Sequence, residues 1–217
     1  AALSILAAER HRRATGEGQL IELALKDVAL AMLGHLGILG EVAVNHEDRP
    51  KLGNALFGAY AQDFVCRDGR RVMVVALTQR QWRNLKAATG TEEAFAALAT
   101  RLSADLEREG ERFRHRHAIT ELLRPFFEAR GVDDFAADFD ERGVTWSVYR
   151  SFSQVVAEDP DCSPDNPMFD VVEHGSGAYL TPASPVAFSG VDRAPPPRAP
   201  RLGEHTDAVL LEIGYGV

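Results

Sequence analysis

The sequence has little cysteine and no apolar run long enough to cross a bilayer. Its two cysteines, Cys66 and Cys162, lie far apart, and neither belongs to a Cys-x-x-Cys or Cys/His ligand spacing. This pattern argues against a disulfide framework and favours a reducing, cytoplasmic compartment. The longest apolar run, residues 28–40, is shorter than a transmembrane helix and contains His35. We therefore predict a buried core helix there and no membrane partner.

Positive charge is also scarce, because 24 Lys and Arg stand against 32 Asp and Glu, which gives a net charge of −8. Phosphate backbones repel an acidic chain, which argues against a nucleic-acid partner. The basic clusters are residues 9–13 and 112–117, and both adjoin acidic residues. We interpret both clusters as solvated helix faces.

The familiar catalytic and metal-binding motifs are absent. The chain has no dinucleotide-binding glycine motif, no phosphate-binding lysine loop, no nucleophile elbow and no His-Glu-x-x-His. His115 and His117 are two residues apart, so their side chains diverge on a helix, and no metal site is predicted. His46, His174 and His205 fall in expected loops or turns, and we interpret them as surface or capping residues.

Helical periodicity and capping residues predict helices along much of the chain. Thr78 and Gln81 form the pattern of a capping box, and Gly90 supplies the stop of the helix that follows them. The expected helices span residues 1–13, 19–37, 80–89, 92–110, 117–131, 131–143 and 151–160, with a last helix that is capped near Thr206.

Runs rich in β-branched residues predict a hairpin whose turn lies at Asp68-Gly69. Its second strand contains a continuously apolar run, residues 72–77, which predicts a central strand. The remaining segments are strands within 144–150 and 171–188, a linker and loop at 41–60, and proline-rich extended chain at 159–169 and 192–203. This order of elements predicts a mixed α and β domain with arms at both ends.

The helix expected at residues 20–39 is apolar on almost every side. At roughly 25 cal/mol per Å² of apolar area, its exposure to water costs several kcal/mol. The small hairpin domain is not large enough to cover both this helix and its own core. We therefore expect the helix to pack on a sheet outside this sequence or on a partner chain.

Three stretches resemble the class III CoA-transferases, the family of the formyl-CoA and carnitine-CoA transferases. Residues 6–33 resemble its alanine-rich helix, arginine pair, Thr-Gly-x-Gly-Gln turn and buried helix. Residues 52–90 resemble the entry to its small domain, and residues 199–215 its C-terminal ending. Together the stretches reach across essentially the whole chain. Within the family, residues 27–37 and 145–169 look most like the mesaconyl-CoA (2-methylfumaryl-CoA) isomerase subgroup.

The resemblance implies an α/β fold, mixed α+β within this chain, in which a small domain is joined to a Rossmann-like large domain. Residues 1–44 correspond to helices of the large domain, and residues 45–170 to the small domain with its hairpin and helices. Residues 171–217 correspond to the extended return and terminal helix of the large domain. The family's homodimers are interlocked rings, so the resemblance also implies a homodimer.

The resemblance further implies CoA transfer between carboxylates, with acyl-CoA as substrate and no cofactor other than the coenzyme A of the substrate itself. The mesaconyl type moves CoA between the two carboxyls of one molecule. The family's catalytic aspartate lies just upstream of the alanine-rich helix, so we expect it before residue 1. The chain would then be the C-terminal portion of the enzyme and inactive alone. Asp27 and Asp63 are not assigned as the nucleophile.

A glycine-rich loop covers the active site of formyl-CoA transferase, and residues 53–58 hold the same position here. The resemblance therefore implies substrate contacts at Gly53, Asn54 and Gly58, and a possible hydrogen bond from Tyr60. A lid suits the chemistry, because a mixed anhydride must be kept from water. The alternatives are a linker turn that leads to the hairpin and a packing role for Tyr60.

Two other functions stay open at this stage. One is a non-catalytic module that dimerises or binds acyl-CoA. The other is an acyl-CoA racemase of the same superfamily, whose proton-transfer residues would also lie upstream of residue 1.

Overall fold

The computed structural model describes residues 1–216 and divides into two compact units. The first unit comprises residues 1–53, and the second begins at Asn54. Each unit is described by itself below. The expected division into residues 1–44, 45–170 and 171–217 concerns large and small domains of a longer protein and stays a prediction.

The first unit contains three helices, α1 (Ala2–Thr15), α2 (Leu25–His35) and α3 (Ile38–Asn45). Helix α1 confirms the helix expected at the start of the chain. It ends where Gly16 adopts a left-handed backbone, φ 81°, and donates its N–H to the carbonyl of Arg12. Glycine is suited to this position because it has no Cβ to clash.

The single helix expected over residues 19–37 is wrong at both ends. Residues 20–24 are not helical, and no side chain caps α2 at Ala24. Gly37 then takes φ 76° and ends the segment. Helix α3 begins at Ile38 and extends to Asn45, into the stretch 41–60 that was predicted as a linker and loop. The axes of α2 and α3 differ by 62°. An apolar run alone does not reveal such a break, because both helices are equally apolar.

The core burial expected for this segment is also wrong within the described chain. Neither α2 nor α3 has a buried residue, and Leu25 is 88% exposed. Within the described residues no single helix has the length and apolarity needed to span a membrane, although the bent α2–α3 pair does by length and composition. Packing on a sheet or chain outside this sequence stays a prediction.

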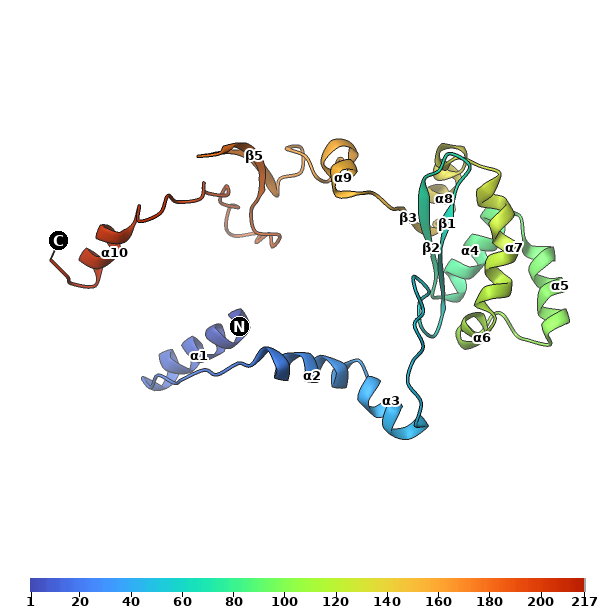
Figure 1. Cartoon of the computed structure of the whole chain (residues 1–217), viewed down its shortest axis with the longest axis horizontal. Coiled ribbons are helices and arrows are strands. Elements are labelled where there is room, and N and C mark those ends of the chain that lie inside the picture. The colour runs from blue at the N-terminus through green and yellow to red at the C-terminus, as the bar shows by residue number, and fades with distance from the viewer. Residues whose placement is uncertain (217) are drawn as a thin grey trace. The chain divides into compact units, whose positions relative to one another are not determined.

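The second unit contains a three-stranded antiparallel sheet of β1 (Tyr60–Val65), β2 (Arg71–Ala76) and β3 (Thr145–Val148), in that order. Figure 1 shows the three strands side by side. The expected hairpin and its turn are confirmed, with Gly69 at φ 80°. The expected central position of the second strand is confirmed as well, since β2 pairs on both sides.

Helices pack on the sheet through contacts of α4 (Gln79–Thr89) with β2 and of α7 (Arg116–Glu128) with β1. The capping box is confirmed: Thr78 accepts from the Gln81 N–H, and Gln81 accepts from the Thr78 N–H. The other elements are α5 (Glu92–Leu102), α6 (Glu109–Arg114), the 3-10 turn η1 (Val132–Asp134) and α8 (Ala136–Glu141).

The helix expected over residues 92–110 is too long. Helix α5 stops at Leu102, because Ser103 adopts a left-handed backbone at φ 50°. The N–H groups of Ser103 and Ala104 then donate to the carbonyls of Thr100 and Ala99. Residues 103–108 form a loop before α6, a stop that no glycine announces in the sequence.

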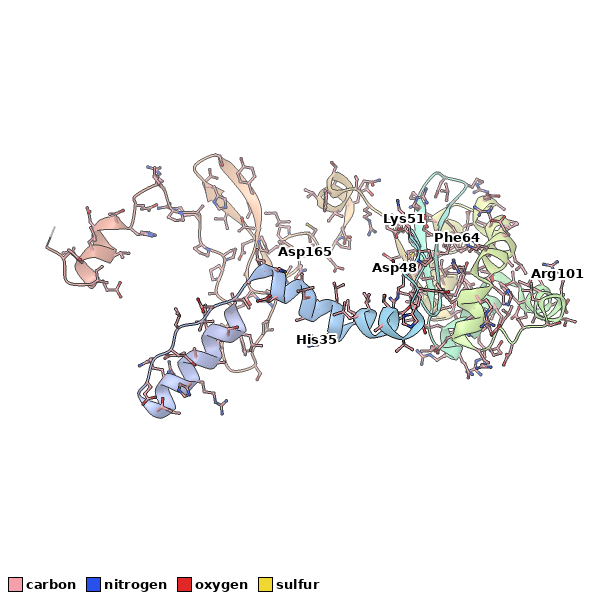
Figure 2. The ribbon with its side chains drawn as sticks, turned by 60° about the horizontal axis from the view of Figure 1, so that its bottom comes forward. His35, Asp48, Lys51, Phe64, Arg101 and Asp165 are labelled. Carbon is pink, nitrogen blue, oxygen red and sulfur yellow. The ribbon has the colours of Figure 1, made fainter. Side chains whose placement is uncertain are left out.

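The core of the second unit lies between the sheet and these helices. Alternate residues of β2 face it, and Val72, Val74 and Ala76 are fully buried. Phe64 of β1, labelled in Figure 2, stacks on Phe127 of α7 with ring centroids 4.3 Å apart. Other large buried side chains are Trp82, Leu85, Phe95, Ile119, Leu123 and Phe139.

The chain continues through α9 (Phe152–Glu158), β4 (Phe169–His174), β5 (Gly177–Pro182) and α10 (Thr206–Glu212). The helix expected near residues 151–160 is confirmed and carries a second capping box, from Ser151 to Gln154. The strands expected within 171–188 form one hairpin. The terminal helix is confirmed, but no side chain caps its first turn.

Candidate functional site

The loop before the first strand contains two turns that require glycine. Gly53 has φ 63° and Gly58 has φ 81°, and a Cβ at either position would meet no atom within 4 Å. The backbone conformation, rather than crowding, therefore selects glycine at both positions. Gly53 ends the first unit, whereas Asn54, Gly58 and Tyr60 all belong to the second.

Tyr60 is the first residue of β1, and its side chain is fully buried. Its hydroxyl lies 3.1 Å from Thr120 Oγ1 on α7, and its ring meets Trp82 edge-on at 6.3 Å. Burial raises the pKa of the hydroxyl, opposed by the Thr120 hydrogen bond. This geometry favours the packing role that the sequence left open. A hydrogen bond from Tyr60 to a substrate would first require the Thr120 pair to separate.

Asp63 is the residue that connects this loop to the sheet. From the sequence we interpret it as a turn or pairing residue at the start of a strand rather than as the nucleophile. It pairs with Met73 across the hairpin, which makes Arg71 its diagonal neighbour on the same face. The Asp63 side chain is only 7% exposed and forms an ion pair with Arg71. Gln62 Nε2 donates to Asp63 Oδ1 at 2.9 Å, and the Asn54 side chain is a further hydrogen-bond partner.

The electrostatics of Asp63 follow from these contacts. Burial, the largest single influence, raises the pKa of the carboxyl, but the hydrogen bonds from Arg71 and Asn54 outweigh it, so that the pKa lies below its usual value. The carboxylate is thus charged and occupied on both oxygens. It is suited to hold its neighbours in place rather than to attack a thioester. A two-residue turn at Asp68-Gly69 would place Asp63 opposite Val74, whereas the observed register places it opposite Met73 and diagonal to Arg71. The contact therefore could not be found from the expected turn.

Because the pKa of Asp63 is lowered by folding, its contribution to stability depends on pH in one direction. It is present above the pKa of the unfolded chain, about 4, and is lost as the pH falls through the lower folded value. We therefore expect the difference in free energy of unfolding between the natural chain and Asp63→Asn to shrink between pH 6 and pH 3. Urea denaturation at several pH values measures it; a difference that stays constant with pH would contradict the assignment.

The loop also touches the basic cluster of residues 112–117. The Phe57 ring meets the Phe113 ring edge-on at 5.0 Å, and the Arg116 guanidinium lies 4.5 Å from the centre of the Phe113 ring. Residues 54–58 are thus supported by α6 as well as by the hairpin.

The interpretation of this cluster as a solvated helix face is wrong for Arg112. Its side chain is fully buried and donates to the carbonyl oxygens of Leu77, Leu106 and Glu107 at 2.8, 3.1 and 2.9 Å. Its guanidinium lies 5.5 Å from the centre of the Trp82 ring. Burial lowers its pKa. No side-chain pattern in the sequence indicates this burial, because all three acceptors are backbone carbonyls, two in the loop before α6 and one directly after β2.

Cys66 and His174 have surroundings that explain their roles in the fold. Burial raises the pKa of the Cys66 thiol to about 11, which disfavours the thiolate needed for attack. His174 Nδ1 accepts from the Ala199 N–H, and its Nε2 lies 3.2 Å from Thr181 Oγ1. Over residues 1–216, no three His, Cys, Asp or Glu side chains come together in a way that could hold a metal ion.

Comparison with known proteins places this geometry in context. A family model described as CoA-transferase family III matches residues 1–206. The chain is 55% identical over 213 residues to the 2-methylfumaryl-CoA isomerase of Chloroflexus aurantiacus, covering 98% of this chain and 52% of that protein. It is 26% identical over 217 residues to the succinyl-CoA:mesaconate CoA-transferase of Haloarcula hispanica, covering 99% and 52%. The chain spans about half the length of the curated relatives it matches.

Solved structures show the same fold. A CAIB/BAIF family protein from Brucella suis matches with a TM-score of 0.67 at 24% identity, covering 97% of this chain and 52% of that one. A protein from Mycobacterium tuberculosis matches with a TM-score of 0.64 at 18% identity, covering 95% and 52%. The mixed α and β fold expected from the sequence is confirmed.

Proposed function

The chain belongs to CoA-transferase family III, and from that premise we propose that it forms about half of an enzyme that moves CoA between the two carboxyl groups of a small dicarboxylic acid. One observation carries the proposal. Identity is 55% to a 2-methylfumaryl-CoA isomerase but only 26% to an intermolecular succinyl-CoA:mesaconate CoA-transferase, over matched regions of similar length. The substrate class proposed is therefore the CoA thioester of an unsaturated, branched dicarboxylic acid.

The proposed chemistry begins at an aspartate that precedes residue 1. Its carboxylate oxygen attacks the thioester carbonyl, and the carbon–sulfur bond breaks. CoA leaves as the thiolate, and the acyl group remains on the aspartate as a mixed anhydride. The thiolate then attacks the aspartyl carbonyl, which forms an aspartyl-CoA thioester and releases the acyl carboxylate. The second carboxylate of the same molecule attacks that thioester, which forms a second mixed anhydride and releases the CoA thiolate. The thiolate then attacks the substrate carbonyl of this anhydride, which forms the new thioester and frees the aspartate. No proton or electron is gained or lost over the cycle.

The part proposed for this chain is to shield that sequence from water. Residues 54–58 form a short loop whose Gly58 turn is open to solvent and whose ends rest on the sheet and on α6. An anhydride persists only where water is excluded. In this proposal, backbone N–H groups at Asn54 and Gly58 lie close to the substrate carboxylate, with Gly53 as the hinge ahead of them.

The proposed partners follow from the exposed apolar side chains of the first unit. Leu25, Met32 and Leu36 are 88%, 50% and 62% exposed. At roughly 25 cal/mol per Å², exposure of these side chains disfavours the isolated chain in water. We propose that this surface is covered by the other half of the enzyme and by a second copy in a homodimer.

The proposal is tested by supplying what the chain lacks. We expect little or no turnover from the 217-residue chain, and isomerisation of 2-methylfumaryl-CoA when it is co-expressed with the part of the Chloroflexus aurantiacus relative that the match leaves uncovered. A gain of at least about 100-fold over either part alone is the expected scale, because catalytic groups and lid are then in one site.

Chromatography of mesaconyl-CoA isomers measures the turnover, and size-exclusion chromatography shows whether the two parts assemble. An assembled complex without CoA transfer would overturn the proposal and leave a non-catalytic binding module. Exchange of solvent deuterium into the carbon beside the thioester, without CoA migration, would instead identify a racemase.

A further inference from the structure

We propose that Asp63 is a positioning residue for the loop of residues 54–58, joining Asn54 at the start of the loop to Arg71 on the neighbouring strand. The inference rests on the proposed function only for the role of the loop, which is to shield the reaction from water. The anchoring itself is a statement about this chain and is tested separately.

The position of Asp63 on the sheet makes it an anchor. Tyr60 and Phe64 point into the core, and the odd-numbered residues of β1 point to the opposite face. That face lies opposite the core, yet the Asp63 side chain is only 7% exposed there. A carboxylate so little exposed is costly unless each oxygen is paired. Arg71 takes Oδ2 and Gln62 takes Oδ1.

The other end of the loop is fixed by different means. Ala59 is 6% exposed and Tyr60 is fully buried, so the chain enters the core directly after Gly58. Between the two ends, Leu56 and Phe57 are 37% and 42% exposed. The loop thus has apolar anchors at Ala59 and Tyr60 and at the Phe57–Phe113 contact, and an electrostatic anchor at Asn54. Only the electrostatic anchor depends on Asp63.

Loss of the Asp63 charge should therefore release the start of the loop without unfolding the sheet. Arg71 is half exposed, so its guanidinium is solvated when the carboxylate is removed. The β1–β2 backbone register from Tyr60 to Val65 does not involve the side chain. Asp63→Asn keeps the shape and removes the charge, which makes it the appropriate variant.

The matched control is Asp68→Asn. Asp68 lies at the turn of the same hairpin and accepts a hydrogen bond from the Val132 N–H. Like Asp63, it forms an ion pair with an arginine of the hairpin, in this case Arg70. It is at the opposite end of β1 from residues 54–58. A general weakening of the hairpin would affect both variants in the same way.

The first measurement uses the 217-residue chain alone. We expect hydrogen exchange of the Asn54 side-chain amide, the group of the loop that donates to Asp63, to become about 10-fold faster in Asp63→Asn and to be unchanged in Asp68→Asn, as loss of one charge-assisted hydrogen bond predicts. Equal protection of this amide in the natural chain and in Asp63→Asn would overturn the anchoring, whatever the enzyme does.

The second measurement uses the two-part complex described above and compares CoA transfer with hydrolysis of the thioester. A misplaced lid admits water, so the ratio of free CoA to isomerised product should rise about 10-fold in Asp63→Asn. A role limited to folding lowers both rates together and leaves the ratio unchanged, which would overturn the positioning role. If the natural complex transfers no CoA, the proposed function fails while the exchange experiment still decides the anchoring.

Discussion

Trp82→Ala is expected to lower the free energy of unfolding of the second unit by about 4 kcal/mol, the scale of a large aromatic side chain removed from a core. The Trp82 side chain is fully buried between α4 and α5. Its ring meets Phe95 at 4.7 Å and Tyr60 at 6.3 Å, and the Lys86 ammonium lies 5.4 Å from its centre. Helix α5 and strand β1 therefore both lose a neighbour on α4 when the ring is removed.

The measurement is urea denaturation followed by far-ultraviolet circular dichroism. Trp146→Ala is the matched control, because these are the two tryptophans of the chain and Trp146 is only partly buried, with its Nε1 donating to Asp140 at 2.8 Å. We expect the control to lose clearly less stability. Equal losses from the two variants would show that Trp82 does not hold the core together.

The indole nitrogen adds a second comparison. Trp82 Nε1 is buried and has no hydrogen-bond partner among residues 1–216. Trp82→Phe keeps most of the apolar ring and removes that unsatisfied donor. It should therefore lower the free energy of unfolding far less than Trp82→Ala does. The difference between the two variants separates the packing of the ring from the polarity of its nitrogen.

Arg112→Ala is expected to lower the free energy of unfolding by about 3 kcal/mol. The variant leaves three backbone carbonyls, of Leu77, Leu106 and Glu107, without their charged donor. Each unsatisfied buried acceptor costs about 1–3 kcal/mol, but removal of a guanidinium whose burial lowers its pKa returns part of that cost. The net effect should still be a clear loss.

The design of this experiment depends on charge as well as shape. Arg112→Lys keeps the charge but reaches fewer carbonyls, and we expect it to recover only part of the stability. Arg114→Ala is the control, since Arg114 is 70% exposed and pairs with Glu111 on the same helix, a contact of little worth in water. If Arg112→Ala were as mild as Arg114→Ala, the three hydrogen bonds would contribute nothing to the fold.

Prediction from sequence succeeded where the signal lies within a few residues. The Thr78–Gln81 capping box and the Asp68-Gly69 turn each involve atoms that the local chain brings together, and both are confirmed. Prediction failed where a helix stops without glycine, as at Ser103, and where two apolar helices follow one another around Gly37. In those places the pattern of apolar residues is the same on both sides of the break.

The candidate site divides in the same way. Gly58 and Tyr60 came from the resemblance, and contact of either residue with substrate stays a prediction. The structure gives Gly58 the positive φ that favours glycine, and it gives Tyr60 the buried contacts of its packing alternative. Asp63 was missed as an anchor because its role depends on Arg71 and Asn54, which the hairpin and the preceding loop bring to it.

The sequence by itself determined the family, the order of most helices and strands, and the place of the hairpin turn, because these depend on neighbours along the chain and on motifs kept in order. Only the tertiary structure decided that Arg112 is buried and that Asp63 is shielded on the outer face of its sheet. Burial of a charge depends on backbone carbonyls and side chains from distant segments, and no local pattern records where those segments meet.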